Sequence, residues 1–221
     1  MIKLYDLVGK GNLSFSPYCW RIKYLLNYKN IPYQTIPTTF TDRIKNNFFG
    51  ESRLPTILDN NEKISDSFVI AKYIEKKYFD HSSILISSSN IDSITFINNW
   101  ADTFLNKSIV QRILNDISFH LDEDDRDYFI TSRTNRFGEH PRDYQAKNLL
   151  IINNEFLQNC KFLNIHLSDR TFILGDKISY ADLILAGSFL WGEKVSTNTR
   201  IDDMFEHLLK WKEEIKNIFE N

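Results

Sequence analysis

The sequence predicts a small α/β domain followed by an all-helical domain, and three observations lead to this fold class. Strand-like and helix-like segments alternate up to residue 80 in the order β-α-β-α-β-β-α. A serine-rich stretch without a long hydrophobic period follows, which is typical of a linker. Beyond residue 90 only helical periodicity remains. We therefore assign residues 1–80 to the α/β domain, 81–90 to a linker and 91–221 to the helical domain.

The composition is that of a folded globular protein. The chain has 221 residues, of which 42% are hydrophobic, enough to bury a sizeable core. Its net charge of −2 provides no field that would attract nucleic acid or an anionic membrane. No segment has the ~18 uncharged apolar residues of a membrane span, and the N-terminus lacks the apolar core of a signal peptide. With only two cysteines, we expect a cytoplasmic protein in a reducing compartment.

The first helix begins at Ser16 and Pro17, directly after a strand expected over 2–6 and its loop. A serine before a first-turn proline is a typical helix start, and the spacing of Trp20, Tyr24 and Tyr28 indicates a buried helical face. The N-terminus of a helix can hold an anion, including a thiolate. In open α/β sheets the ligand site lies at the carboxyl ends of the strands, where Ser16 would be. The alternative is that Ser16 is only a helix cap.

The rest of the first domain is predicted from short signals. A strand over 33–37 and a weak helix over 40–49, ended by Gly50, precede a β-hairpin whose strands cover 53–59 and 63–65. Asn60 and Asn61 form its turn. Asp66 and Ser67 then cap a helix over 68–78.

The second domain is predicted to be helical throughout. A long apolar stripe covers 91–121, and further helices cover 143–167, 180–190 and 204–219. Ser179 and Asp182 form a capping box at the start of the third of these four segments. We interpret the acidic run at 122–127 as a solvated turn and 133–138 as a basic loop. The acidic run lacks regular ligand spacing and the five histidines are scattered, so we expect no metal site.

Four motifs in the right order make the chain resemble the cytosolic glutathione transferases. They are Ser-Pro at the first helix, Leu-Pro before the third strand, Asp-Ser before the third helix, and Gly-Asp-x-x-Ser-x-Ala-Asp from Gly175 to Asp182. The resemblance covers essentially the whole chain. It implies a thioredoxin-like N-terminal domain, an all-helical C-terminal domain, glutathione as co-substrate and a homodimer.

The resemblance also implies roles for individual residues. Ser16 matches the catalytic serine whose hydroxyl donates a hydrogen bond to the glutathione sulfur. Leu54, before a cis Pro55, matches the residue whose backbone pairs with the cysteinyl unit. Arg53 lies where the family often has a basic or amide residue near the glycine carboxylate. Asp66 and Ser67 match the acidic-serine pair that holds the γ-glutamyl group.

Within the family, the chain is most similar to the bacterial β-etherase-like proteins and the related fungal transferases. The matching segments are Ser-Pro-Tyr-x-Trp-Arg-x-Lys at 16–23, Arg-Phe-Gly at 136–138 and Phe-Leu-Trp at 189–191. The substrate of that subgroup does not carry over to this chain; from the proposed attack by glutathione thiolate we expect an electrophilic, mostly apolar small molecule that binds between the domains. The candidate walls of that pocket are aromatic: Phe15, Tyr18, Trp20, Trp100, Phe104 and, as a further candidate, Trp191.

Two readings from other classes remain. The protein could bind glutathione and hydrophobic ligands without catalysis. It could also be a redox or deglutathionylating enzyme, because Ser16-Pro17-Tyr18-Cys19 resembles the Cys-Pro-Tyr-Cys motif of glutaredoxins with the first cysteine replaced. Without that nucleophilic sulfur a dithiol mechanism is lost, so the sequence favours transfer chemistry.

Overall fold

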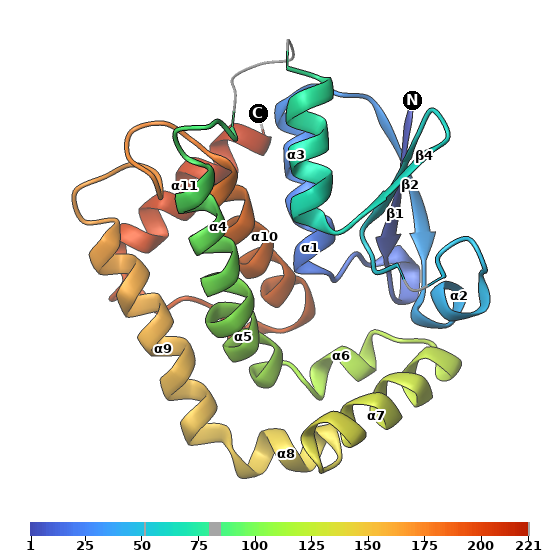
Figure 1. The fold of residues 1–221 in the computed structure, drawn as a ribbon. Coiled ribbons are helices and arrows are strands. Elements are labelled where there is room, and N and C mark those ends of the chain that lie inside the picture. The colour runs from blue at the N-terminus through green and yellow to red at the C-terminus, as the bar shows by residue number, and fades with distance from the viewer. Residues whose placement is uncertain (51, 80–84, 221) are drawn as a thin grey trace.

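A four-stranded mixed sheet organises the first domain (Figure 1). The computed structural model describes residues 1–50, 52–79 and 85–220. The strand order is β2-β1-β3-β4, with β1 parallel to β2 and antiparallel to β3, and with β3 antiparallel to β4. This is the thioredoxin-like arrangement that the sequence predicts. The strands are β1 (Ile2–Leu7), β2 (Tyr33–Thr38), β3 (Thr56–Asp59) and β4 (Glu62–Ser65).

Three α-helices complete this domain. They are α1 (Pro17–Tyr28), α2 (Phe40–Lys45) and α3 (Ser67–Lys77), with a short 3₁₀ turn at Lys10–Asn12. Helices α1 and α3 lie on the side of the sheet that faces the second domain (Figure 1). The predicted hairpin is confirmed: Asn60 and Asn61 have φ of 48° and 72°, the left-handed pair that a tight two-residue turn requires. The Leu54-Pro55 bond is cis, as expected.

Helix α2 is shorter than the helix predicted over 40–49. It ends at Lys45, because the side chain of Asn46 accepts a hydrogen bond from the backbone N–H of Phe48 at 2.9 Å. Such a local turn competes with helix continuation. The rings of Phe48 and Phe49 then pack against Tyr5 of the sheet, with centroids 4.9 and 5.4 Å away.

The second domain is helical, and α10 forms its centre. This helix is buried along most of its length and packs against α1. A π-helical turn (Ala101–Leu105) joins α4 to α5, and a 3₁₀ turn (Thr197–Thr199) follows α10. The helices are α4 (Ile91–Trp100), α5 (Asn106–Arg112), α6 (Asp116–Phe119), α7 (Glu123–Phe137), α8 (Pro141–Lys147), α9 (Leu149–His166), α10 (Tyr180–Val195) and α11 (Glu206–Glu220).

Two predictions for this domain are wrong, and α7 is the reason for both. The acidic run was expected to be a solvated turn, but it forms the first turn of α7. The positive end of the helix dipole stabilises carboxylates at this position. The segment expected as a basic loop is the last turn of the same helix, which Gly138 ends in the left-handed conformation with φ of 79°. Figure 1 shows α7 as a ridge that runs beneath α2.

The other helix boundaries deviate less. The helix predicted over 143–167 is divided at Asn148, whose side-chain amide donates to the carbonyl of Tyr144 at 2.8 Å. The capping box of Ser179 and Asp182 is confirmed. Residues 80–84, which contain the predicted domain boundary and the first four residues of the predicted linker, lie outside the described residues. None of the helices described is long and apolar enough to cross a membrane.

Candidate active site

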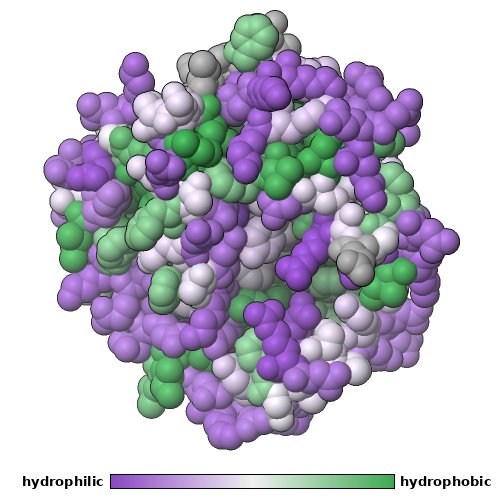
Figure 2. Space-filling model, in the orientation of Figure 1, coloured by the Kyte–Doolittle hydropathy of each residue, from purple (hydrophilic) through white to green (hydrophobic). Residues whose placement is uncertain are grey.

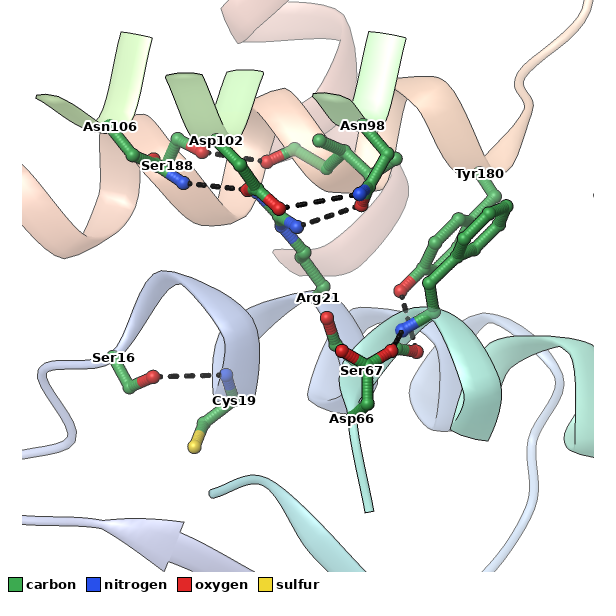
Figure 3. A network of polar contacts seen from close by, with 12 residues as sticks. Ser16, Cys19, Arg21, Asp66, Ser67, Asn98, Asp102, Asn106, Tyr180 and Ser188 are labelled. Carbon is green, nitrogen blue, oxygen red and sulfur yellow. Dashed lines mark hydrogen bonds and ion pairs between the residues drawn. The ribbon is translucent and has the colours of Figure 1, made fainter. Parts of the chain in front are cut away.

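Ser16 caps α1 next to the carboxyl end of β1. The Ser16 Oγ accepts a hydrogen bond from the backbone N–H of Cys19 at 3.3 Å (Figure 3), and Ser16 is only 4% exposed. The backbone N–H of the preceding Phe15 donates to the carbonyl of Leu7, which holds the loop to the sheet. Because the Ser16 oxygen acts as an acceptor in the cap, its hydroxyl can still donate a hydrogen bond to a second group, such as an anion.

Asp66 and Ser67 begin α3. The Asp66 carboxylate accepts the N–H groups of Phe68 and Val69 at 2.9 and 3.0 Å, and its backbone has a φ of 76°. Ser67 is buried, and its carbonyl accepts the phenol of Tyr180 from α10 at 3.1 Å (Figure 3). The second domain therefore holds the start of α3 in place.

The loop before β3 presents an unpaired piece of backbone. Leu54 makes no hydrogen bond, through either its N–H or its C=O, to another residue in the described ranges. Arg53 is exposed, and its carbonyl accepts the hydroxyl of Thr56 at 3.0 Å. The guanidinium of Arg43 on α2 donates to the Ser52 carbonyl at 3.0 Å, which links α2 to this loop.

A buried arginine joins the two domains behind these groups. Arg21 is 0% exposed, and its guanidinium donates to Asp102 at 2.8 Å and to Asn98 at 3.1 Å (Figure 3). Asn106 also donates to the Asp102 carboxylate, at 3.1 Å. Sequence analysis assigned Arg21 no role, because its partners lie about eighty positions away and no local pattern marks them.

Of the aromatic candidates near α1, Tyr18 is the one whose ring lies beside this network. The Arg21 guanidinium is 4.8 Å from the centroid of the Tyr18 ring. Burial, and then the Asp102 carboxylate, raise the pKa of Tyr18. The ring of Phe15 is instead buried and packs edge-on against Phe40, with centroids 5.7 Å apart. The indole of Trp20 donates to the Ser14 carbonyl at 3.2 Å.

The remaining aromatic candidates lie on α4, the π-turn and α10, at different depths. Trp100 packs against Phe162 of α9, with ring centroids 5.3 Å apart. Phe104 is 55% exposed, whereas Trp191 is buried in α10. The predicted wall residues are thus distributed over several surfaces and do not form a single wall.

Cys19 is a thiol without access to solvent. It is 0% exposed, and its sulfur accepts the N–H of Leu7 at 3.5 Å. Burial and then the neighbouring Asp6 raise the pKa of Cys19 far above that of an ordinary thiol. A redox reaction needs an accessible thiolate, so this environment does not support the redox reading.

Helix α7 supplies contacts that sequence analysis missed. The Asp125 carboxylate is buried and accepts the N–H groups of Phe40 and Thr41 at 3.1 and 2.9 Å, which caps α2 from the second domain. Phe129, one turn further along α7, lies 6.1 Å from the Phe40 ring between centroids. The spacing of four residues could have identified a helical face here if the charged run had been considered part of a helix.

Comparison with known proteins assigns both domains to the same protein family. Residues 12–82 match the model of the glutathione S-transferase N-terminal domain, and residues 94–216 match that of the C-terminal domain. A glutathione S-transferase of Arabidopsis thaliana, U28, is 27% identical over 180 residues, which cover 80% of this chain and 68% of the relative.

Solved structures agree over nearly the full length. A glutathione S-transferase of Ceriporiopsis subvermispora, solved in complex with glutathione, is 25% identical and has a TM-score of 0.78, covering 98% of this chain and 97% of the other. The transferase GSTFuA3 of Phanerochaete chrysosporium shares the fold, with 19% identity, a TM-score of 0.81 and coverage of 98% and 96%. The chain therefore belongs to the glutathione S-transferase family.

Proposed function

We propose that this glutathione transferase is of the serine type, with Ser16 as the residue that activates the glutathione sulfur. The hydrogen bonding of Ser16 carries this proposal: the oxygen already accepts the Cys19 N–H, which leaves the proton for a partner at the start of α1. A thiolate suits that position, because the N-terminus of a helix stabilises negative charge.

The energy required is within reach of these groups. A thiol with a pKa near ~8.5 is only slightly ionised at neutral pH, and lowering that pKa by about 2 units needs about 2.7 kcal/mol of preferential interaction. A hydrogen bond to a charged group contributes about 1.5–3 kcal/mol, and the helix terminus adds up to about 1 kcal/mol. Ser16 and the α1 N-terminus can therefore supply the shift together.

The rest of glutathione would lie along the first domain. The unpaired N–H and C=O of Leu54 suit the cysteinyl backbone, and exposed Arg53 suits the glycine carboxylate. The Asp66 carboxylate would pair with the γ-glutamyl ammonium group, while Ser67 and the N-terminus of α3 would bind the γ-glutamyl carboxylate. Asp66 already satisfies two backbone donors and keeps an exposed face toward solvent.

The reaction is nucleophilic attack by the thiolate on an apolar electrophile between the domains. The thiol proton leaves to solvent, a C–S bond forms, and the leaving group departs with its electron pair, as chloride does from a chloronitroarene. Tyr18 is the aromatic residue best placed to line the electrophile pocket, since it lies within one turn of Ser16 and beside the Arg21 network. We also propose that the protein acts as a cytoplasmic homodimer.

Replacing Ser16 by two different residues tests the mechanism. Ser16→Ala removes both the hydroxyl and the helix cap, whereas Ser16→Gly removes the hydroxyl but keeps a residue tolerated at the cap. Both variants should lower kcat/KM for 1-chloro-2,4-dinitrobenzene by about tenfold to a hundredfold, the value of one hydrogen bond to a charge. Steady-state kinetics measure this loss, and urea unfolding measures stability.

The comparison between the two variants separates catalysis from folding. Ser16→Ala should lose about 1 kcal/mol of stability through the cap, while Ser16→Gly loses only a few tenths. Equal losses of activity with unequal losses of stability would support the hydroxyl as the active group. Wild-type turnover in both variants would remove Ser16 from the mechanism.

A further inference from the structure

One face of α7 points toward the first domain and carries two arginines. At 3.6 residues per turn, Asp125, Phe129, Arg133 and Arg136 lie on adjoining parts of one helical face. Asp125 and Phe129 contact the first domain directly, through the N-terminus of α2 and the ring of Phe40. The two arginines therefore continue that face of α7 beyond the residues that contact α2.

Arg133 lies at the end of a row of aromatic rings that leads to Ser16. Its guanidinium carbon is 4.7 Å from the centroid of the Phe129 ring and 6.0 Å from that of Phe40. The Phe40 ring in turn packs edge-on against Phe15, the residue directly before Ser16. Arg133 is half-buried, so its charge is only partly screened by water.

Arg136 is exposed, and its charge reaches the other side of the same space. The pKa of Tyr18 is raised by burial and then by Asp102, while the charges of Arg21 and Arg136 act in the opposite direction. Figure 2 shows hydrophilic side chains around the hollow in the middle of this face, next to α6 and α7.

No carboxylate in the described ranges balances these two charges. Neither Arg133 nor Arg136 forms an ion pair there. The nearby acids are already engaged: Asp125 accepts two backbone N–H groups of α2, and Asp102 pairs with Arg21. Burial, and then the like charge of Arg136, lower the pKa of Arg133, which is the effect of an uncompensated positive site.

We propose that Arg133 and Arg136 bind a carboxylate on the electrophilic substrate, so that the enzyme prefers anionic over neutral electrophiles. This inference rests on the proposed function. A guanidinium binds a carboxylate through two parallel hydrogen bonds, which gives direction as well as affinity. Glutathione also carries a glycine carboxylate, but Arg53 lies beside Leu54 on the first domain, whereas Arg133 lies on α7 beside the rings that lead to Ser16.

Binding of two glutathione conjugates that differ in one group tests this preference without relying on turnover. The probes are S-(4-carboxy-2-nitrophenyl)glutathione and its carboxamide counterpart, measured by calorimetry. The wild-type protein should bind the carboxylate about tenfold more tightly, as expected for hydrogen bonds to a charge. Arg133→Gln/Arg136→Gln should remove that preference and leave the affinities for the carboxamide and for free glutathione unchanged. Arg142→Gln, an exposed arginine of α8, is the matched control.

Kinetics with 4-chloro-3-nitrobenzoate and 4-chloro-3-nitrobenzamide give a second readout. The ratio of their kcat/KM values should fall by about tenfold in the double variant, because intrinsic reactivity cancels between enzymes. Arg136→Gln alone, at an exposed site, serves if the double variant does not fold. Equal affinity of the wild-type protein for both conjugates would overturn the inference. The inference would also be overturned if the double variant lost affinity for glutathione while the ratio of its affinities for the two conjugates stayed at the wild-type value. The arginines would then bind the glycine carboxylate of glutathione. Absent glutathione binding would instead refute the proposed function, and the inference with it.

Discussion

Ser16 caps α1 through the hydrogen bond that its oxygen accepts from the Cys19 N–H. In the proposed mechanism the same hydroxyl donates its proton to the sulfur of glutathione, so that one residue serves both folding and catalysis. The sequence predicts this position well, since Ser-Pro before an amphipathic run is a local signal. The same holds for Asp66, whose cap on α3 needs only the N–H groups of Phe68 and Val69, two and three residues later.

The two cysteines should be unreactive in the folded protein. Cys19 and Cys160 are both 0% exposed, and burial raises both pKa values, that of Cys160 to about 12. At pH 8 Ellman's reagent should therefore modify neither thiol before unfolding and both after it. Cys160→Ala, which leaves Cys19 alone, identifies the site. Rapid modification of Cys19 in that native variant would reopen the redox reading.

Side chains whose environment is set by distant residues could not be predicted. Phe15 follows the turn in sequence, but Phe40, twenty-five positions later, covers its ring. Arg21 looks like a solvated residue of an amphipathic helix, yet Asn98 and Asp102 bury its charge. A single sequence gives the identity of these residues but does not show which of them are in contact in the folded protein.

At the scale of elements, α7 shows how charge patterning can mislead. The acidic run and the basic segment each look like exposed turns on their own, but they are the first and last turns of one helix. Opposite charges at its two ends favour the helix dipole, and the partners that fix its position belong to α2. The other α-helices lie in segments predicted to be helical, whereas the breaks at Asn46 and Asn148 depended on single side-chain hydrogen bonds.

Asp125 should position the glutathione site through α2. Asp125→Asn weakens the cap on Phe40 and Thr41, and α2 is linked by Arg43 to the loop before Leu54. We expect KM for glutathione to rise about threefold to tenfold, with kcat changing less, because a charge-assisted cap is worth about 1–2 kcal/mol. Steady-state kinetics with varied glutathione measure this split.

The control for that variant is Asp124→Asn. The Asp124 side chain is 81% exposed and lies 3.8 Å from Lys45, so its loss should leave KM unchanged. Hydrogen exchange of the α2 amides should accelerate only in the Asp125 variant. The same kinetics in both variants would contradict a positioning role for Asp125.

At the scale of the whole molecule, the two domains share a tightly packed boundary. Helix α1 approaches α10 so closely that a Cβ on Gly187 would lie 2.8 Å from the Pro17 carbonyl oxygen. Arg21 crosses the same boundary to reach Asp102. The domain order was predictable from periodicity alone, but this packing depends on pairs that are far apart in sequence.

Removing Asp102 alone should lower the free energy of unfolding more than removing both partners of the Arg21–Asp102 ion pair. Asp102→Ala leaves the fully buried Arg21 guanidinium without its carboxylate, which costs about 3 kcal/mol, since Asp102 is partly exposed. Arg21→Met/Asp102→Ala replaces the charge with an apolar side chain and should recover most of that loss. Urea unfolding of both variants measures the difference. Equal destabilisation in the two would contradict an uncompensated charge as the cause.

The central claim is that Ser16 and the start of α1 hold glutathione as a thiolate. The most direct measurement is the ultraviolet difference spectrum of the glutathione complex across pH, for the wild-type protein and Ser16→Gly, with binding followed in parallel by calorimetry. We expect a thiolate band at neutral pH in the wild-type complex. In the Ser16→Gly complex the band should appear only about 1–2 pH units higher, while the affinity for glutathione stays similar. Bound glutathione without the band at neutral pH would contradict the account and favour a ligand carrier.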